Sequence, residues 1–312
     1  MTNLIRESLE KIDRIVAACS EIILGKEGQI RLAVTCMMAG GHLLIEDLPG
    51  VGKTTLSHTL AKVLGLQFQR IQFTSDLLPS DISGISVFDR DSGSFQFHPG
   101  PIFSQFILAD EINRATPKTQ SALLEAMEER QVTTEGKTRK LPEPFFVIAT
   151  QNPSHQIGTF PLPESQLDRF LMRIALGAPD RNAERELLKG DDRRELIEHL
   201  QPVVTAEELL GLQKMIKQVH TSEALLDYLQ ALLEESRQSS LFVHGLSPRA
   251  GLSCLHSAQA WAILNGRDFV DPKDLQTILP ATIGHRLQAS DDYMGYSSDD
   301  LIKLFIESVA IP

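Results

Sequence analysis

"EDLPGVGKTT" (Glu46–Thr55) follows the short apolar run "HLLI" and has the form of a phosphate-binding loop. The usual pattern is G-x-x-x-x-G-K-S/T. Asp47 takes the place of the first glycine, and the motif positions after it match up to Thr54. Gly50 and Gly52 still give the backbone next to the phosphates its conformational freedom. The stretch therefore predicts a strand, a nucleotide-binding loop and a helix, in this order.

The residue types in this loop suit a bound nucleoside triphosphate and Mg²⁺. Lys53 would reach the β and γ phosphates, and the hydroxyl of Thr54 would ligate Mg²⁺. Backbone N–H groups from Gly50 to Thr54 would cradle phosphate oxygens, because the N-terminus of a helix favours an anion. The predicted nucleotide-binding residues are Pro49, Gly50, Val51, Gly52, Lys53, Thr54 and Thr55, with Thr54 also a metal ligand.

The first half of the chain alternates short apolar runs with helical patterns, which predicts a doubly wound α/β domain. The apolar runs are nearly continuous, as in strands buried on both faces of a parallel sheet. The expected strands are His42–Glu46, Phe68–Phe73, Phe106–Ala109, Phe145–Thr150 and Phe170–Leu176. The helical patterns beside them are Glu27–Ala39, Thr54–Leu64 and Pro117–Arg130.

Two stretches interrupt this alternation and read as inserted hairpins. Gly84–Gly100 alternates polar and apolar residues around "DRDSGS", and Arg130–Pro144 turns near Glu135 and Gly136. From about Pro179 onward only helical periods follow, several of them after a Thr, Ser or Asp cap. We therefore predict an α/β domain over residues 1–177, with inserts near 84–100 and 130–144, and an all-α domain over residues 178–312.

Composition limits the classes of protein to consider. The chain has 312 residues, which fits about two domains. Its 30 basic and 41 acidic residues give a net charge of −11, which weighs against nucleic acid as the main partner. No apolar run approaches the roughly 20 residues that span a bilayer. Cys19, Cys36 and Cys254 match no zinc pattern, so we expect free thiols in a reducing compartment and a cytoplasmic location.

Two further motifs place polar side chains at strand ends. "FILADEIN" (Phe106–Asn113) ends an apolar strand in two acids. Asp110 would bind Mg²⁺, and Glu111 would orient and polarise an attacking water. "FFVIATQNP" (Phe145–Pro153) ends a second strand near Asn152. Because open α/β sheets bind ligands at the carboxyl ends of their strands, both motifs should meet the phosphate loop there.

Together these motifs resemble those of the AAA+ ATPases, and more narrowly those of the MoxR family, over essentially the whole chain. Further stretches that carry the resemblance are "FTSDLLPSDISGISVFD" (73–89), "PLPESQLDRFLMRI" (161–174) and "LSPRAGLSCL" (246–255). An acid in place of the first glycine is itself a trait of that family, so Asp47 departs from the general pattern without breaking the site. The resemblance implies an AAA+ P-loop parallel sheet flanked by helices, a smaller all-α lid, and ATP with Mg²⁺ as cofactors.

The resemblance also implies roles for single residues. Asn152 matches sensor 1, Arg169 in "QLDRF" matches the arginine finger, and Arg249 in "LSPRA" matches sensor 2, which reaches the nucleotide from the lid. An arginine fork stabilises the charge on a transferred phosphoryl group, and a finger supplied in trans is worth about 10³–10⁵ in rate. Open alternatives are a surface ion pair of Arg169 with Asp168, and Arg173 or Arg114 as the finger.

The resemblance implies Mg²⁺-dependent ATP hydrolysis. It also implies that the protein acts as a ring, because an arginine finger supplied in trans requires a neighbouring subunit, and the expected ring is a hexamer. The resemblance to MoxR-like proteins implies chaperone-like maturation of a client protein, including metal-cofactor insertion. It also implies a separate partner protein that carries a von Willebrand factor A domain. Three alternatives stay open: a DNA motor, an ATP-binding switch without turnover, and the motor subunit of a metal chelatase.

Overall fold

A five-stranded parallel sheet forms the centre of the computed structural model, which describes residues 3–152, 158–190 and 192–311. Met1, Thr2 and Pro153, the last residue of the second strand motif, lie outside the described residues. The sheet order is β2-β5-β8-β1-β9. Its strands are β1 (Leu43–Glu46), β2 (Phe68–Gln72), β5 (Phe106–Asp110), β8 (Phe146–Gln151) and β9 (Met172–Ile174). The predicted α/β fold class is confirmed.

The three inner strands bury both of their faces. Alternate residues point to opposite sides of a sheet, so Leu43 and Ile45 join one apolar core while Leu44 joins the other. The first core continues into helices at both ends of the chain. The second core lies under the remaining face and includes side chains of the helix that follows β5. Two-sided burial explains why the inner strands could be recognised from apolar runs.

The expectation that every strand is buried on both faces is wrong for β2. This strand lies at the edge of the sheet. Gln69, Arg70 and Gln72 are exposed, and Ile71 alone in the strand is fully buried. An edge strand has a neighbour on one side only, so it can keep polar side chains. Two of these side chains reach the acids at the end of β5, as described below.

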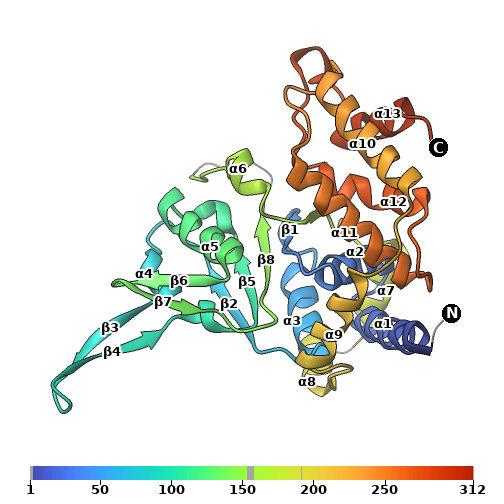
Figure 1. Cartoon of the computed structure of the whole chain (residues 1–312). Helices are drawn as coiled ribbons and strands as arrows, with labels where there is room; N and C mark the ends of the chain where they lie inside the picture. Colours follow the sequence, from blue (N-terminus) through green and yellow to red (C-terminus); the bar gives the residue numbers. More distant parts are fainter. Residues whose placement is uncertain (1–2, 153–157, 191, 312) are drawn as a thin grey trace.

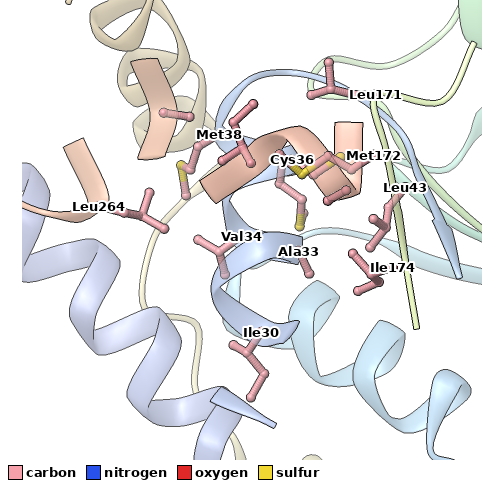
Figure 2. Packing of buried hydrophobic residues seen from close by; sticks show 14 of the residues in the cluster. Ile30, Ala33, Val34, Cys36, Met38, Leu43, Leu171, Met172, Ile174 and Leu264 are labelled. Carbon is pink, nitrogen blue, oxygen red and sulfur yellow. The ribbon is translucent and has the colours of Figure 1, made fainter. Parts of the chain in front are cut away.

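Helices from the start of the chain cover the face of the sheet that joins the first core. Ile30, Ala33 and Val34 lie in one apolar cluster with Met172 of β9 and Leu264 from the helical end of the chain (Figure 2). Burial of such side chains contributes about 25 cal/mol per Å² of apolar surface. The three helices are α1 (Asn3–Ile22), α2 (Glu27–Met38) and α3 (Lys53–Val63).

Two antiparallel hairpins lie within the α/β part, β3–β4 and β6–β7. The first projects far from the sheet (Figure 1). The hairpins contact each other, because the guanidinium of Arg139 lies 3.6 Å from the ring centre of Phe97 and Ser86 donates a hydrogen bond to Glu135. The elements of this region are α4 (Pro79–Ser83), β3 (Gly84–Asp89), β4 (Ser94–Pro99), η1 (Pro101–Phe103), η2 (Ile112–Arg114), α5 (Pro117–Glu129), β6 (Gln131–Thr134) and β7 (Lys137–Lys140).

The described residues after β9 contain helices and two isolated β-bridges. Their apolar side chains share the first core with α1–α3, so the helical part packs directly on the α/β part (Figure 1). A domain boundary at residue 177 stays a prediction. No helix among the described residues is long and apolar enough to cross a membrane. The remaining helices are α6 (Glu164–Leu167), α7 (Arg181–Lys189), α8 (Arg193–His199), α9 (Ala206–Ile216), α10 (Glu223–Gln238), α11 (Pro248–Leu264), α12 (Pro272–Ile283), η3 (Asp291–Tyr293) and α13 (Ser298–Ser308).

Candidate active site

The phosphate loop connects the end of β1 to the start of α3. Gly50 and Gly52 have φ of 86° and 94°, a left-handed conformation that glycine adopts without steric cost. A Cβ added at either glycine would meet nothing within 4 Å, so the loop faces open space. The first backbone N–H groups of α3 have no partner within the helix and are available to an anion.

A hollow of about 300 Å³ lies against this loop. It brings together the phosphate loop, the end of β5 and the residue after β8. Val51 packs against the apolar core instead, and Arg169 and Arg249 do not line the hollow. The lining residues are Pro49, Gly50, Gly52, Lys53, Thr54, Thr55, Asp110, Glu111 and Asn152, all of them predicted from the sequence.

Lys53 is held at the mouth of the loop. Its Nζ donates to the backbone oxygen of Asp47 at 2.5 Å and to Oδ1 of Asn152 at 3.1 Å. Burial lowers the pKa of Lys53, while the negative charges of Asp47, Asp110 and Glu111 act in the opposite direction. The ammonium group therefore lies where a phosphate could replace protein oxygens as its partner.

Asp110 is buried and each of its carboxylate oxygens has a protein partner. Oδ1 accepts from the hydroxyl of Thr150 at 2.6 Å, and Oδ2 accepts from Nη2 of Arg70 at 2.6 Å. A carboxylate oxygen can accept more than one hydrogen bond, so a metal-bound water can still bind here. Thr54 lines the same hollow. The two side chains fit Mg²⁺, which is usually held by one or two carboxylates together with phosphate oxygens and water.

No cluster of three or more His, Cys, Asp or Glu side chains suited to a metal was found in the part of the chain that the structure describes. A site that shares its metal with a nucleotide does not need such a cluster, because phosphate oxygens supply most of the ligands.

Glu111 stands at the exit of β5 in a left-handed conformation, with φ of 56°. Its Oε1 accepts from Nδ2 of Asn152 at 3.2 Å, so two predicted site residues are in direct contact. Its Oε2 accepts from Gln72 at 3.0 Å and from Arg114 at 2.9 Å. Such backbone conformations are costly in residues other than glycine and cluster at functional sites. The geometry directs this carboxylate into the hollow.

Three residues that contact Asp110 and Glu111 were not predicted from the sequence. Arg70 and Gln72 are two residues apart on β2, so they share one face of the strand and reach Asp110 and Glu111. Thr150 lies two residues before Asn152 on the neighbouring strand and accepts the backbone N–H of Glu111 at 2.9 Å. The available signal was a pair of polar residues two positions apart in an expected strand. In the sheet this strand pairs with the strand that ends in the two acids.

Arg169 and Arg249 bind the same carboxylate, that of Glu128 near the end of α5. Nε of Arg169 lies 3.0 Å from Oε2, and Nη1 of Arg249 lies 3.0 Å from Oε1. Arg249 also approaches Asp168, with 3.9 Å between Nε and Oδ2. The structure thus brings the two predicted arginines together on Glu128, and neither of them lines the hollow at the phosphate loop. The ion pair of Arg169 is with Glu128 rather than Asp168.

The segment that carries Arg169 is fixed by the helical part. Arg286, which follows α12, is almost fully buried and donates from Nε to Oδ1 of Asp168 at 2.7 Å. It also donates to the backbone oxygen of Phe170 at 2.7 Å. Each of the two alternative fingers pairs with an acid: Arg114 with Glu111, which lines the hollow, and Arg173 with Glu46, both at 2.9 Å.

Family models match two segments of the chain. Residues 42–172 match the ATPase family associated with various cellular activities (AAA), and residues 234–303 match an AAA lid domain. The first match spans β1, β2, β5 and β8 of the sheet, both hairpins and the whole hollow, and it ends at the first residue of β9. The second spans most of the helical part, including Arg249.

Similar proteins extend the match to nearly the full length. The chain is 41% identical to the uncharacterized protein YeaC of Bacillus subtilis, over 96% of this chain and 95% of that one. It is 36% identical to Chaperone MoxR1 of Mycobacterium tuberculosis, over 96% and 82%. A crystal structure assigned as an ATPase of Cytophaga hutchinsonii superposes with a TM-score of 0.89 at 36% identity, covering 99% and 97%. The chain therefore belongs to the MoxR family of AAA+ ATPases.

Proposed function

We propose that the protein is an Mg²⁺-dependent ATPase that acts as a ring of identical subunits, a hexamer. The observation that carries this proposal is the single hollow in which Lys53, Asp110, Glu111 and Asn152 meet a phosphate loop. Mg²⁺ bound with ATP would neutralise negative charge on the phosphates. Lys53 would bind the β and γ phosphates, and Thr54 and Asp110 would hold the metal.

Glu111 and Asn152 would prepare the water that attacks the γ phosphate. The carboxylate of Glu111 can accept a proton from this water, and the contact with Asn152 orients both side chains. A positioned general base contributes about 10²–10⁴ in rate. Gln72 and Arg114 hold the other carboxylate oxygen, so the side chain has few alternative positions.

The composition of the hollow supports the proposed ring. None of the nine residues that line it is an arginine. The transition state of phosphoryl transfer carries charge that an arginine fork stabilises. Arg169 and Arg249 lie together on Glu128, so we propose that both serve the nucleotide of the next subunit. The expected contact of Arg249 with a nucleotide stays a prediction, and the proposal assigns it to the nucleotide of the next subunit.

The ATPase rate per subunit should rise steeply with protein concentration, because each site is completed only between subunits. The measurement is phosphate release across the concentration range in which sizing shows assembly, with Glu111→Gln as the blank. A flat rate down to concentrations where only monomer exists would refute the ring. A rate that never exceeds the blank would refute the ATPase activity itself.

Replacing Glu128 with glutamine should lower kcat about five- to tenfold and leave the KM for ATP nearly unchanged. Glu128 offsets the repulsion between Arg169 and Arg249 and holds both in one place. The effect is limited because all three side chains are partly exposed. Glu129→Gln on the same helix is the matched control and should behave as wild type. A faster Glu128→Gln enzyme would show that this carboxylate restrains the arginines instead of positioning them.

We further propose chaperone-like work on a client protein in the cytoplasm, with metal-cofactor insertion as one form of it. Support comes from the relative named Chaperone MoxR1 and from the resemblance seen in the sequence, which also suggests a separate partner with a von Willebrand factor A domain. The β3–β4 hairpin offers a surface for such contacts, since Phe88 and Phe95 are 52% and 73% exposed.

A further inference from the structure

Asp47 contacts three separate parts of the chain, although glycine usually occupies its position in a phosphate loop. Its backbone N–H donates to the oxygen of Gln151 at 3.2 Å, and its backbone oxygen accepts from Nζ of Lys53 at 2.5 Å. Its carboxylate accepts from the N–H of Leu48 at 2.7 Å and from the N–H of Gly177 at 2.6 Å. The contacts with Leu48 and Lys53 lie within the phosphate loop, and the contact with Gln151 joins the loop to the end of β8. The fourth reaches the segment that leads into the helical part.

The segment around Gly177 is held mainly by residues of the α/β part. Gly177 has φ of 67°, which most other residues avoid. The next residue, Ala178, accepts a hydrogen bond from Nζ of Lys26 at 2.5 Å. Asp180 then caps α7 by accepting from two backbone N–H groups at 2.8 Å. Asp47 and Lys26 therefore help to place this linker, together with the buried side chain of Leu176 just before it.

The other side of Asp47 is sensitive to the nucleotide. Lys53 donates to the backbone oxygen of Asp47 in the structure, yet it is the residue expected to bind the β and γ phosphates. A phosphate that takes over this ammonium group weakens its bond to Asp47. The peptide of Asp47 can then shift, and the carboxylate on the same residue shifts with it. A change at the phosphates thus reaches the N–H of Gly177 through a single residue, by one hydrogen bond on each side of Asp47.

We propose that Asp47 is a positioning residue that couples the occupancy of the phosphate loop to the placement of the helical part. The proposal rests on the proposed ATPase function. Coupling of this kind is a free energy shared by two sites, so it acts in both directions. The placement of the helices also affects how Lys53 holds the phosphate. A purely local role, in which Asp47 only shapes the turn through Leu48, would leave the helices uncoupled.

The chain contains a natural reporter for the helical part. Trp261 on α11 is its only tryptophan. The guanidinium of Arg31 on α2 lies 5.6 Å from the centre of this ring and also donates to the backbone oxygen of Leu264 at 3.0 Å. A change in the packing of α11 on α2 alters the surroundings of the indole. Its emission therefore reports movement of the helices without any need for turnover.

The test compares Asp47→Gly with wild type, because glycine is the usual residue in such loops and leaves the cradle of Gly50 and Gly52 intact. Mg²⁺ with ADP or with a non-hydrolysable ATP analogue is titrated, binding is followed by calorimetry, and Trp261 emission is recorded. Asp47→Gly should still bind, but its emission change should fall below about a third of the wild-type change. Its kcat should fall about five- to twentyfold, within the range of ordinary coupling between sites.

Leu48→Ala is the matched control, because the side chain of Leu48 is 62% exposed and takes no part in the hydrogen bond between Asp47 and Gly177. It should keep the full emission change. Asp47→Asn retains one acceptor oxygen, so its emission change should lie between those of wild type and Asp47→Gly. This variant also serves as the test if Asp47→Gly does not fold. A full emission change in the Asp47 variants would overturn the proposal. So would a wild-type protein that binds nucleotide without any change in emission, or an Asp47→Gly protein that no longer binds. Failure of wild type to bind any nucleotide would instead refute the proposed function.

Discussion

The Glu111→Gln variant is expected to bind ATP about as well as wild type and to hydrolyse it about 10²–10⁴-fold more slowly. Glutamine has the size of glutamate and can keep a contact with Asn152, but it cannot take a proton from the attacking water. The residues expected to bind phosphate lie on a different segment, so affinity should persist. Steady-state phosphate release gives kcat, and calorimetry gives the affinity for Mg²⁺ and ATP.

Glu129→Gln is the matched control for this change, because it removes the same charge from an exposed site on α5. Turnover of Glu111→Gln close to the wild-type rate would remove Glu111 from the role of general base. Loss of ATP binding together with turnover would point to a structural role, such as the hydrogen bonds that Gln72 and Arg114 make with this carboxylate.

The Arg169→Ala variant is expected to fold, to bind ATP and to lose about 10³–10⁵ in kcat. Arg169 would supply the fork that stabilises the transferred phosphoryl group in the next subunit. Its side chain is partly exposed and, among the described residues, it forms an ion pair with Glu128 alone, which is itself partly exposed, so its removal leaves no buried charge unpaired there. Arg185→Ala, an exposed arginine on α7, is the control and should retain wild-type activity.

A mixture of Arg169→Ala and Glu111→Gln separates a finger in trans from one in cis. The first variant keeps an intact hollow but lacks the arginine, and the second keeps the arginine but lacks the base. In an equimolar mixed ring, about a quarter of the sites combine an intact hollow with an intact neighbouring arginine. Activity should therefore reappear when two nearly inactive proteins are mixed and allowed to exchange subunits. Two variants that exchange subunits and stay inactive together would refute the trans assignment.

Features carried by neighbouring residues could be predicted from the sequence. The phosphate loop is contiguous, and the hollow formed by the structure is lined by residues predicted for it. The inner strands were recognised because both of their faces are buried, which produces unbroken apolar runs. Asp110, Glu111 and Asn152 were placed correctly next to the loop, since parallel strands bring their carboxyl ends to one edge of the sheet.

Features that depend on charge pairing between distant segments could not be read in this way. Glu128 lies in the helical pattern Pro117–Arg130, which does not show that two arginines from two other segments pair with it. Arg70 was taken as part of a buried strand, although the strand lies at an edge where a polar side chain can reach Asp110. Each of these contacts depends on how helices and strands that are distant in the sequence pack against one another. The local pattern of residues does not reveal this packing.

Helix α5 places the two ends of a subunit's chemistry on one rigid body. The helix begins shortly after η2, which follows Glu111. Glu128 lies in the last turn of α5 and pairs there with Arg169 and Arg249, which come from other segments. Thirteen residues of α-helix span about 20 Å. In a closed ring, the rod would tie the state of a subunit's own γ phosphate to the arginines that this subunit lends onward. A change at either end of α5 would then be felt at the other end of the same helix.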